Sequence, residues 1–524
     1  MQFRLELANH RTNIYLIIII LIASFFRLSW LAEIPNGFHQ DESTTGYDAY
    51  SLLKTARNQY GEFLPLFSQA FGDYNESLSR FMTVPFIKIF GLNEFATRLP
   101  IALVGIFTIP VLYYLVKELF NRKLAIISAL ILAISPWHIQ FSRIAYTGIL
   151  LPFFFCLALL FFVKSLKHTS YFYLTAIAFA FSIYTYNPAK IFVPIFIIYL
   201  IILFRKYLWR KKEAFISLLI FLPIFFFLFS FWISPEGMTR VRTSGGIINN
   251  PLDIILSYLS YFSPKFLFFS GDPNPRHSSP NMGQLYLVEI VTIIVGFWVL
   301  IRKQGYQRNI LLFWLFMYPI PAALIGPNHA LRSIVGIPVF TIISALGIYQ
   351  ILYLFKAWGK VALISTLLAL TFSLAIYFNS YFIEYPKQSK YNTWRYGMKE
   401  AINYVEKSKY SCGIVSNQFH HINSFILFFT KYDPALYQKS PIDPLLSFRN
   451  QSSYSIGKFR IISMNDINQY NYHQCVFMLM PNDLKTIRSL GLDWHEKYTI
   501  INPTGSAEIH LGEVTKNGKH SGGY

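Results

Sequence analysis

The sequence predicts a polytopic α-helical membrane protein with a small α/β domain outside the membrane. Apolar runs of about 17–25 residues recur between residues 13 and 382, each long enough for a helix that crosses a hydrocarbon core of about 30 Å. Basic residues follow these runs on alternate sides. From residue 384 onward the composition becomes that of a soluble protein. These three observations define the fold class.

The composition excludes a soluble globular protein. Hydrophobic residues make up 54% of the 524 residues and charged residues only 14%, against about 25% charged residues in soluble domains. The first run has no small-residue cleavage site after it, so we interpret it as a retained helix and not as a signal peptide. We place about eleven spans, at residues 14–32, 99–116, 124–137, 149–163, 171–186, 191–204, 214–233, 285–301, 309–326, 333–355 and 361–382.

The net charge of +20 has a topological origin. In a soluble chain it would suggest nucleic acid, but here Lys and Arg gather in short clusters at the ends of alternate spans. The positive-inside rule makes those clusters cytoplasmic. We therefore expect a plasma-membrane protein with a cytoplasmic N-terminus and no nucleic-acid partner. The segments expected outside are 33–98, 138–148, 187–190, 234–284, 327–332 and everything after residue 383.

Three domains follow from this topology. Residues 1–383 form the transmembrane module, whose two long outer loops are 33–98 and 234–284. The first loop is expected to contain an interfacial helix at residues 78–90, whereas the second is rich in Pro, Gly, Asn and Ser and is predicted to be a loop.

The remaining residues, 384–515, are predicted to form a small extracytoplasmic α/β domain. Strand-like patterns predict strands at 412–416, 459–464 and 475–480. Helical patterns predict helices at 394–407 and 482–490. Residues 516–524 are expected to be disordered.

Three cysteines fit neither a zinc site nor a disulfide-rich scaffold. Cys412 and Cys475 each open a strand-like run, and the starts of neighbouring parallel strands lie close together. An outer domain also permits oxidation. A disulfide and two buried, reduced cysteines are both open interpretations.

Two acidic clusters lie in the first outer loop. "GFHQDESTTGYDAY" places Asp41 and Glu42 just outside the first span, and "FGDYNES" adds Asp73 and Glu76 about thirty residues later. Together they can supply a general base or hold a divalent cation. The alternative for Asp41 is a solvated loop acid without a catalytic role.

Four phrases carry a family resemblance. Arg27 followed by "FHQDESTTGYDAY", then "FGLNEFATRLP", "SPWHIQFSRIAYTG" and "YTYNPAKIFVP" occur in this order. Over roughly residues 15–345 the chain resembles the GT-C superfamily of membrane glycosyltransferases, in the branch of the dolichyl-phosphate-mannose protein mannosyltransferases and the lipid A aminoarabinose transferase. The resemblance implies a GT-C-like fold, a polyprenyl-phosphate-sugar donor, and Asp41 as catalytic base, with Glu42 beside it.

This chemistry needs specific groups at the outer membrane surface. A carboxylate must accept the proton of the acceptor hydroxyl, here with inversion at the sugar. Cations must stabilise the leaving phosphate. Asp73 and Glu76 are assigned to the acceptor or metal side, and Tyr47 and Arg98 to the substrate pocket. The candidates for the donor phosphate are Arg332, His329, Arg276, His277, Arg143 and Lys190.

Each of these cations has an alternative role in binding the headgroups of membrane lipids. Arg27, inside the first span, is expected to form a structural ion pair that faces protein. The only cofactor considered is a divalent cation.

Two other functions remain open. A transporter or flippase would usually have ionisable groups at mid-membrane and broken helices or repeats, and the spans have few such groups. A lipid-linked glycan ligase or polymerase would rely on arginine, whereas the Asp41–Glu42 pair favours a transferase. The sugar and the acceptor, whether protein, lipid or glycan, are not specified by the sequence.

Overall fold

The computed structural model describes residues 2–239, 246, 248–354, 359–442, 453–470 and 472–516. The chain forms two compact units. The helical unit comprises Met1–Leu31 and Leu99–Glu384, and the mixed unit comprises Ala32–Arg98 and Tyr385–Tyr524.

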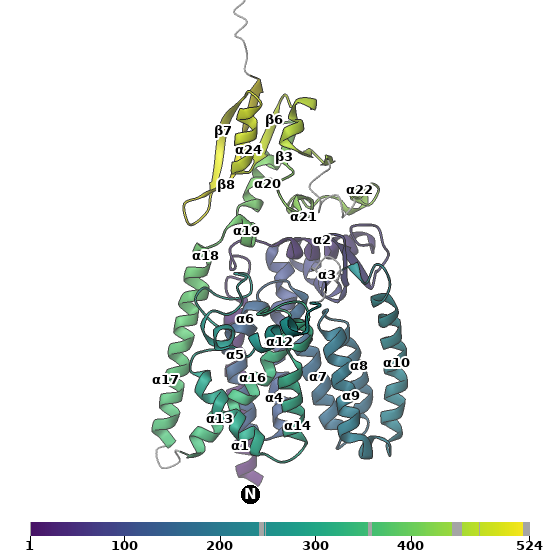
Figure 1. Cartoon of the computed structure of the whole chain (residues 1–524), viewed down its shortest axis with the longest axis vertical. Helices are drawn as coiled ribbons and strands as arrows, with labels where there is room; N and C mark the ends of the chain where they lie inside the picture. The colour runs from purple at the N-terminus through teal and green to yellow at the C-terminus, as the bar shows by residue number, and fades with distance from the viewer. Residues whose placement is uncertain are drawn as a thin grey trace, which may run out of the picture. The chain divides into compact units, whose positions relative to one another are not determined.

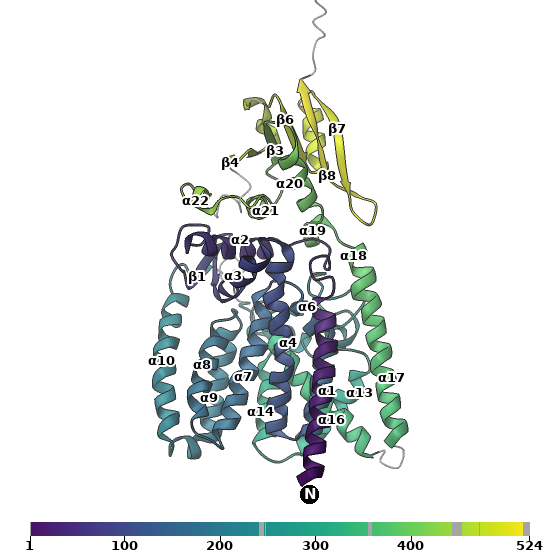
Figure 2. The ribbon, with the colours of Figure 1, turned by 180° about the vertical axis from the view of Figure 1, so that it is seen from behind.

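The helical unit is a bundle of apolar helices, along which α1 runs lengthwise (Figures 1 and 2). Its main helices are α1 (Gln2–Leu28), α4 (Glu94–Leu119), α5 (Arg122–Ile134), α6 (Pro136–Ser142), α7 (Leu150–Ser165), α8 (Tyr171–Ile183), α9 (Ala189–Leu208), α10 (Lys212–Trp232), α13 (Glu289–Arg302), α14 (Tyr306–Met317), α16 (Ile337–Leu354) and α17 (Gly359–Phe378).

Small residues let α13 and α16 approach closely. A Cβ on Gly296 would collide with the backbone of Ile343, and a Cβ on Gly347 would collide with that of Thr292. The hydroxyls of Thr292 and Ser344 also hydrogen-bond across the pair at 2.7 Å. Close backbone approach and polar contacts between helices are what hold helices together in a membrane, where burial of apolar surface contributes little.

Each of the eleven predicted spans contains a helix. Among the described residues, six helices are long and apolar enough to cross a membrane, or seven if α5 and α6, bent by 57° at Ser135, form one broken span. Several of the other helices are shorter, such as α8 with 13 residues. The protein is a multi-pass membrane protein, and the number eleven stays a prediction.

The segment 234–284 is not the continuous loop that its composition predicted. It contains α12 (Pro251–Ser260) and the π-helical turn η2 (Lys265–Phe269). Asn250 accepts a hydrogen bond from the backbone N–H of Leu252 at 3.0 Å, and Pro251 occupies the first turn. Asn and Pro were interpreted as loop formers, but at these positions they start a helix.

The sheet of the mixed unit has the order β4-β5-β3-β6-β8-β7. Its parallel centre is formed by β5 (Phe459–Ile462), β3 (Cys412–Ser416) and β6 (Cys475–Leu479), which confirms the three predicted strands. The helices α20 (Met398–Lys407) and α24 (Pro481–Ser489) confirm the two predicted helical patterns.

Antiparallel strands at both edges of the sheet were not predicted. They are β4 (Tyr454–Ile456), β7 (Leu492–Ile501) and β8 (Ala507–Lys516). Most residues of β7 are exposed, so this strand has no clear alternation of apolar and polar residues. Because β8 reaches Lys516, the first residue of the predicted tail lies in a strand, while residues 517–524 lie outside the described residues.

The first outer loop packs with the C-terminal segment in one core. This division differs from the sequence-based one, which placed residues 33–98 in the transmembrane module. The helix α2 (Gln40–Thr55) buries Tyr47 and Ala49 against Phe425 and Phe428 of α21 (Ile422–Phe429). Because α2 has an apolar face, it needs a partner such as α21. The second predicted boundary, after residue 383, lies one residue from the observed division after Glu384.

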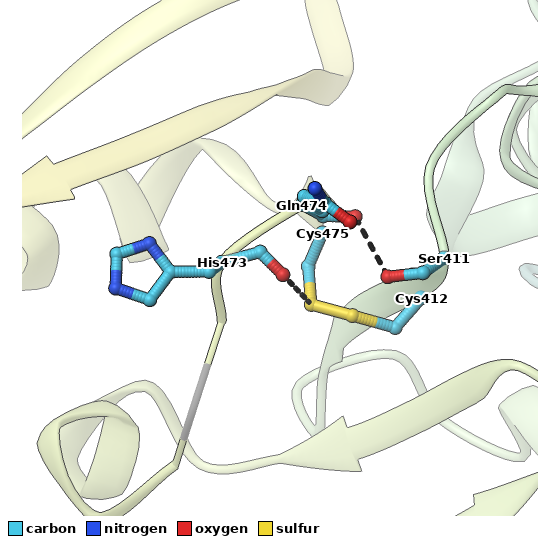
Figure 3. Close-up of a disulfide and its surroundings, with 5 residues drawn as sticks. All are labelled: Ser411, Cys412, His473, Gln474 and Cys475. Carbon is cyan, nitrogen blue, oxygen red and sulfur yellow. Dashed lines mark hydrogen bonds between the residues drawn. A yellow bond between two sulfur atoms is a disulfide. The ribbon is translucent and has the colours of Figure 1, made fainter.

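A disulfide joins Cys412 and Cys475, with their Cα atoms 4.6 Å apart (Figure 3). The two residues face each other in the register of the parallel pair β3 and β6. The sequence had left open a bridge or two reduced cysteines, and the structure contains the bridge.

We expect thiol labelling of the denatured, unreduced protein to modify only Cys156, and all three cysteines after reduction. The bridge closes a separation of 63 residues, so a Cys412→Ala/Cys475→Ala variant should lose about 4 kcal/mol of stability in the chain-entropy model. Denaturant midpoints of the variant and the wild type measure this. Three labels without reduction would contradict the bridge.

Candidate functional site

Asp41 lies in the first turn of α2 with an accessible carboxylate. His39 caps the helix, and the backbone N–H of Asp41 donates to His39 Nδ1 at 3.4 Å. The side chain of Asp41 is 54% exposed, whereas that of His39 is buried. A general base has to reach the proton that it accepts, and the exposed carboxylate of Asp41 meets this condition.

Glu42 is fully buried in an ion pair with Arg98. Its two oxygens accept from Arg98 Nε at 2.8 Å and Nη2 at 3.1 Å. Arg98 also donates to the carbonyls of Ala32, Pro35 and Gly37. The pair fixes the chain that leads into α2, and so it positions Asp41.

Both residues predicted for the substrate pocket are instead in the core of the mixed unit. Arg98 is held by Glu42 and three backbone carbonyls, as described above. Tyr47 is completely buried, and its hydroxyl donates to the carbonyl of Tyr432 at 3.0 Å. The sequence showed a cation and an aromatic residue near the membrane surface, but it could not show these intramolecular partners.

Asp73 and Glu76 lie in β2 (Asp73–Glu76), which pairs with β1 (Phe67–Ala70) as a hairpin. Both side chains are largely buried. Among the described residues, the one group of three or more His, Cys, Asp or Glu side chains whose ligand atoms converge does not include them. A cation site built from the two acidic clusters therefore gains no support from the geometry.

The C-terminal segment contributes residues near Asp41 that the sequence did not indicate. Burial lowers the pKa of His421 to about 3, although the charge of Asp41 acts in the opposite direction. The His421 ring lies on Phe71 of the hairpin turn, with ring centroids 4.1 Å apart. Arg395 donates from Nε to the side-chain oxygen of Gln40 at 3.1 Å. A His-His doublet in the sequence was the only available signal.

A second cluster lies in two loops of the helical unit. Asp272 Oδ2 accepts hydrogen bonds from His277 Nδ1 at 2.8 Å and from the backbone N–H of Ala330 at 2.7 Å. His329 Nδ1 is 4.0 Å from the same oxygen. Four of the predicted phosphate-binding residues, Arg276, His277, His329 and Arg332, are thus on the two loops that Asp272 ties together.

The two arginines of these loops are partly exposed. Arg276 donates from Nη1 to the hydroxyl of Tyr146 at 3.3 Å, and its carbonyl accepts from Gln140 at 2.7 Å. The backbone N–H of Arg332 donates to His329 Nδ1 at 3.3 Å. Both backbones are therefore fixed, which favours a defined anion-binding geometry.

Asp272 and His329 have defined charge states at neutral pH. Burial opposes ionisation of Asp272, but the hydrogen bond from His277 holds its pKa below the ordinary value. Burial and the positive charge of Arg332 lower the pKa of His329 to about 3. The carboxyl of Asp272 is therefore ionised, and the imidazole of His329 is neutral.

Arg143 and Lys190 make other contacts. Arg143 is completely buried and donates to the carbonyls of Phe26 and Ser29 at 2.8 and 2.7 Å, at the C-terminal end of α1. Lys190 lies over the ring of Trp232 at 5.2 Å. The contacts of Arg143 indicate a structural role at the end of α1.

Arg27 does not form the ion pair that was expected. Its guanidinium donates to the carbonyls of Ala133 and Leu132 at 2.8 and 3.2 Å, and lies 2.8 Å from His138 Nδ1. Because α5 ends at Ile134, its last carbonyls lack helical partners. These carbonyls accept hydrogen bonds from the guanidinium of Arg27, in place of a carboxylate.

Known sequences match parts of the chain. A family model described as dolichyl-phosphate-mannose-protein mannosyltransferase matches residues 78–231. An uncharacterized protein of Aquifex aeolicus (strain VF5) is 29% identical over 269 residues, which are 48% of this chain and 51% of that protein. The match thus spans about half the length of this curated relative.

Solved structures match over nearly the whole chain. The crystal structure of ArnT from Cupriavidus metallidurans in the apo state has a TM-score of 0.61 at 11% identity, covering 96% of this chain and 98% of ArnT. The protein has a GT-C glycosyltransferase fold. The structure of ArnT bound to undecaprenyl phosphate matches with a TM-score of 0.60, at 11% identity over 95% of this chain and 97% of ArnT.

A more distant GT-C protein matches as well. The archaeal oligosaccharyltransferase AglB from Archaeoglobus fulgidus, in complex with an inhibitory peptide and a dolichol-phosphate, has a TM-score of 0.51 at 13% identity over 80% of this chain and 64% of AglB. The chain thus resembles GT-C enzymes of the ArnT and protein mannosyltransferase branch, as the sequence phrases predicted.

Proposed function

We propose that this protein transfers a sugar from a polyprenyl-phosphate carrier to an acceptor hydroxyl at the extracytoplasmic face of the membrane, with inversion at the anomeric carbon. The observation that carries the proposal is an exposed carboxylate, Asp41, at the start of a buried helix in a chain with a GT-C fold. Asp41 accepts the proton of the acceptor hydroxyl as the oxygen attacks the sugar.

The fold and two similar proteins support the proposed class of donor. ArnT and AglB have been solved with undecaprenyl phosphate and with a dolichol-phosphate. A carrier of this kind keeps its prenyl tail in the bilayer, so the sugar is transferred at the membrane surface. The multi-pass helical unit provides the apolar surroundings that such a tail requires.

Arg332 and Arg276 are assigned to the phosphate of the donor. Charge develops on this phosphate as the bond to the sugar breaks, and guanidinium groups stabilise it by bidentate, charge-assisted hydrogen bonds. Asp272 fixes the two loops by its bonds to His277 and Ala330. Arg98 and Arg143 are excluded from this role, because both are fully buried and donate to backbone carbonyls.

Glu42 has a positioning role in this proposal. Both of its oxygens are engaged by Arg98 and by the backbone N–H of His39 at 3.1 Å. This bonding leaves Asp41 as the member of the acidic pair that faces solvent.

We expect Arg332→Ala to lower kcat/KM for the donor while the KM for the acceptor changes little. A hydrogen bond to a charged group contributes about 1.5–3 kcal/mol, so the loss in kcat/KM should be about 10–150-fold. Arg332→Lys should restore only part of it, because lysine lacks the bidentate geometry.

Initial rates at varied donor concentration measure this effect. Lys265→Ala is the matched control, since Lys265 is an exposed cation of the same unit. A normal kcat/KM for the donor in Arg332→Ala would move the phosphate role to Arg276.

A further inference from the structure

We propose that Asp272, His277 and His329 bind one divalent metal ion of the zinc class. Its residues differ from the acidic clusters of the first outer loop, which the sequence had suggested as a cation site. It lies entirely within the helical unit, on the two loops described above.

The ligand atoms already converge. One atom from each of the three residues lies within 4.8 Å of the others. The distances from Asp272 Oδ2 are 2.8 Å to His277 Nδ1 and 4.0 Å to His329 Nδ1. These values bracket the spacing of about 3.4 Å that a tetrahedral ion with bonds near 2.1 Å imposes on its ligands. To bind the ion through Nδ1, His329 would exchange the hydrogen bond that this atom accepts from the backbone N–H of Arg332 at 3.3 Å.

The ligands are held by a second layer of hydrogen bonds. Asp272 Oδ1 accepts from the backbone N–H of Asn274 at 2.8 Å, and the backbone N–H of Asp272 donates to Ser278 Oγ at 2.8 Å. Gln284 in turn donates to the same hydroxyl at 2.6 Å. Metal sites depend on such outer-shell bonds to orient their ligands, and Asp272 has them in place.

The chemistry of the donors favours a transition metal. An ionised carboxylate and a neutral imidazole are the forms that ligate a metal ion. Two nitrogen donors and one oxygen suit Zn²⁺ or Co²⁺, whereas Mg²⁺ and Ca²⁺ prefer oxygen donors alone. The nearby cations Arg276 and Arg332 repel a metal ion, and the negative charge of Asp272 offsets this repulsion.

The alternative is an internal hydrogen-bond network that only ties the loops together, because His277 Nδ1 bonds to Asp272 and His329 Nδ1 accepts from the backbone N–H of Arg332 at 3.3 Å. The 4.0 Å between His329 and Asp272 is too long for a hydrogen bond, although the ring centroids of His277 and His329 are only 4.8 Å apart. The side chain of His329 is also 26% exposed.

Metal binding can be measured without donor or acceptor, so its outcome is independent of the proposed transfer reaction. The full-length protein, purified in detergent with a tag that contains no histidine, is washed with chelator and titrated with Zn²⁺ by calorimetry. Co²⁺ replaces Zn²⁺ to give a visible absorption spectrum. We expect one ion per chain, a Co²⁺ spectrum of four-coordinate type, and no binding of Mg²⁺.

Variants assign the ion to the three residues. We expect His329→Ala, His329→Gln and Asp272→Asn each to weaken Zn²⁺ binding by more than about 100-fold, since even outer-shell changes cost about 10–100-fold. Because His329 is partly exposed, its variants should keep the thermal unfolding profile of the wild type. His168→Ala, which removes an exposed histidine elsewhere in the helical unit, should bind normally. Absence of stoichiometric binding, or wild-type affinity in the His329 variants, would overturn the proposal.

Discussion

Asp41→Asn should abolish glycosyl transfer while the protein still inserts into the membrane and folds. The side chain is exposed, so the substitution changes no packing. It removes the proton acceptor, and general base catalysis contributes about 10²–10⁴-fold to a rate. The rate of product formation at saturating donor and acceptor measures the effect, and thermal unfolding of the purified variant confirms the fold.

The matched control for this variant is Glu33→Gln. Glu33 is an exposed acid in the same outer loop, and we assign it no role in the reaction. Its substitution should leave the rate unchanged. If Asp41→Asn kept more than about a tenth of the wild-type rate, the proton acceptor would have to be another group.

Arg98→Met should destabilise the mixed unit by about 3–5 kcal/mol, because it leaves the buried carboxylate of Glu42 without its cation. The three carbonyls of Ala32, Pro35 and Gly37 lose their donor as well. We therefore expect a lower unfolding temperature and rapid proteolysis of residues 32–98. Transfer should fall with them, because the start of α2 loses its support.

Lys399→Met provides the comparison for Arg98→Met. The pair of Lys399 and Glu94 has a distance of 2.6 Å, but the lysine side chain is 58% exposed. Exposed pairs contribute about 0–1 kcal/mol, so the unfolding temperature should hardly change. Equal stability losses in the two variants would mean that burial of the Arg98–Glu42 pair is not what holds the loop.

The elements that the sequence predicted well are those with a strong local signal. The apolar helices and the strands at Cys412 and Cys475 are continuous apolar runs, and both strands are buried at every position. The helix at Met398 buries one regular face. The hairpin of β7 and β8 was missed because eight of the ten residues of β7 are at least partly exposed. The packing of α2 on α21 was missed because it joins residues far apart in the chain.

The candidate site was predicted only in part, because the partners of its side chains come from distant parts of the chain. A cation on the outer face needs a partner, and the sequence suggested the donor phosphate or lipid headgroups for six of these residues and the substrate pocket for Arg98. Arg98 and Arg143 are satisfied by carbonyls and a carboxylate, which depend on tertiary structure. Asp272 was overlooked because it is a single acid in a loop that was noted for its cations. The loops that carry His277 and His329 were predicted, but their convergence on Asp272 was not.

Mass spectrometry of envelope glycolipids and glycoproteins, with and without the gene, tests the proposed transfer most directly. We expect deletion to remove one sugar mass from a defined acceptor class and to leave the polyprenyl-phosphate sugar unconsumed. The wild-type gene should restore the modification, and the Asp41→Asn gene should not. Unchanged glycans, together with altered sugar or lipid uptake in the deletion strain, would contradict a glycosyltransferase and indicate a transporter.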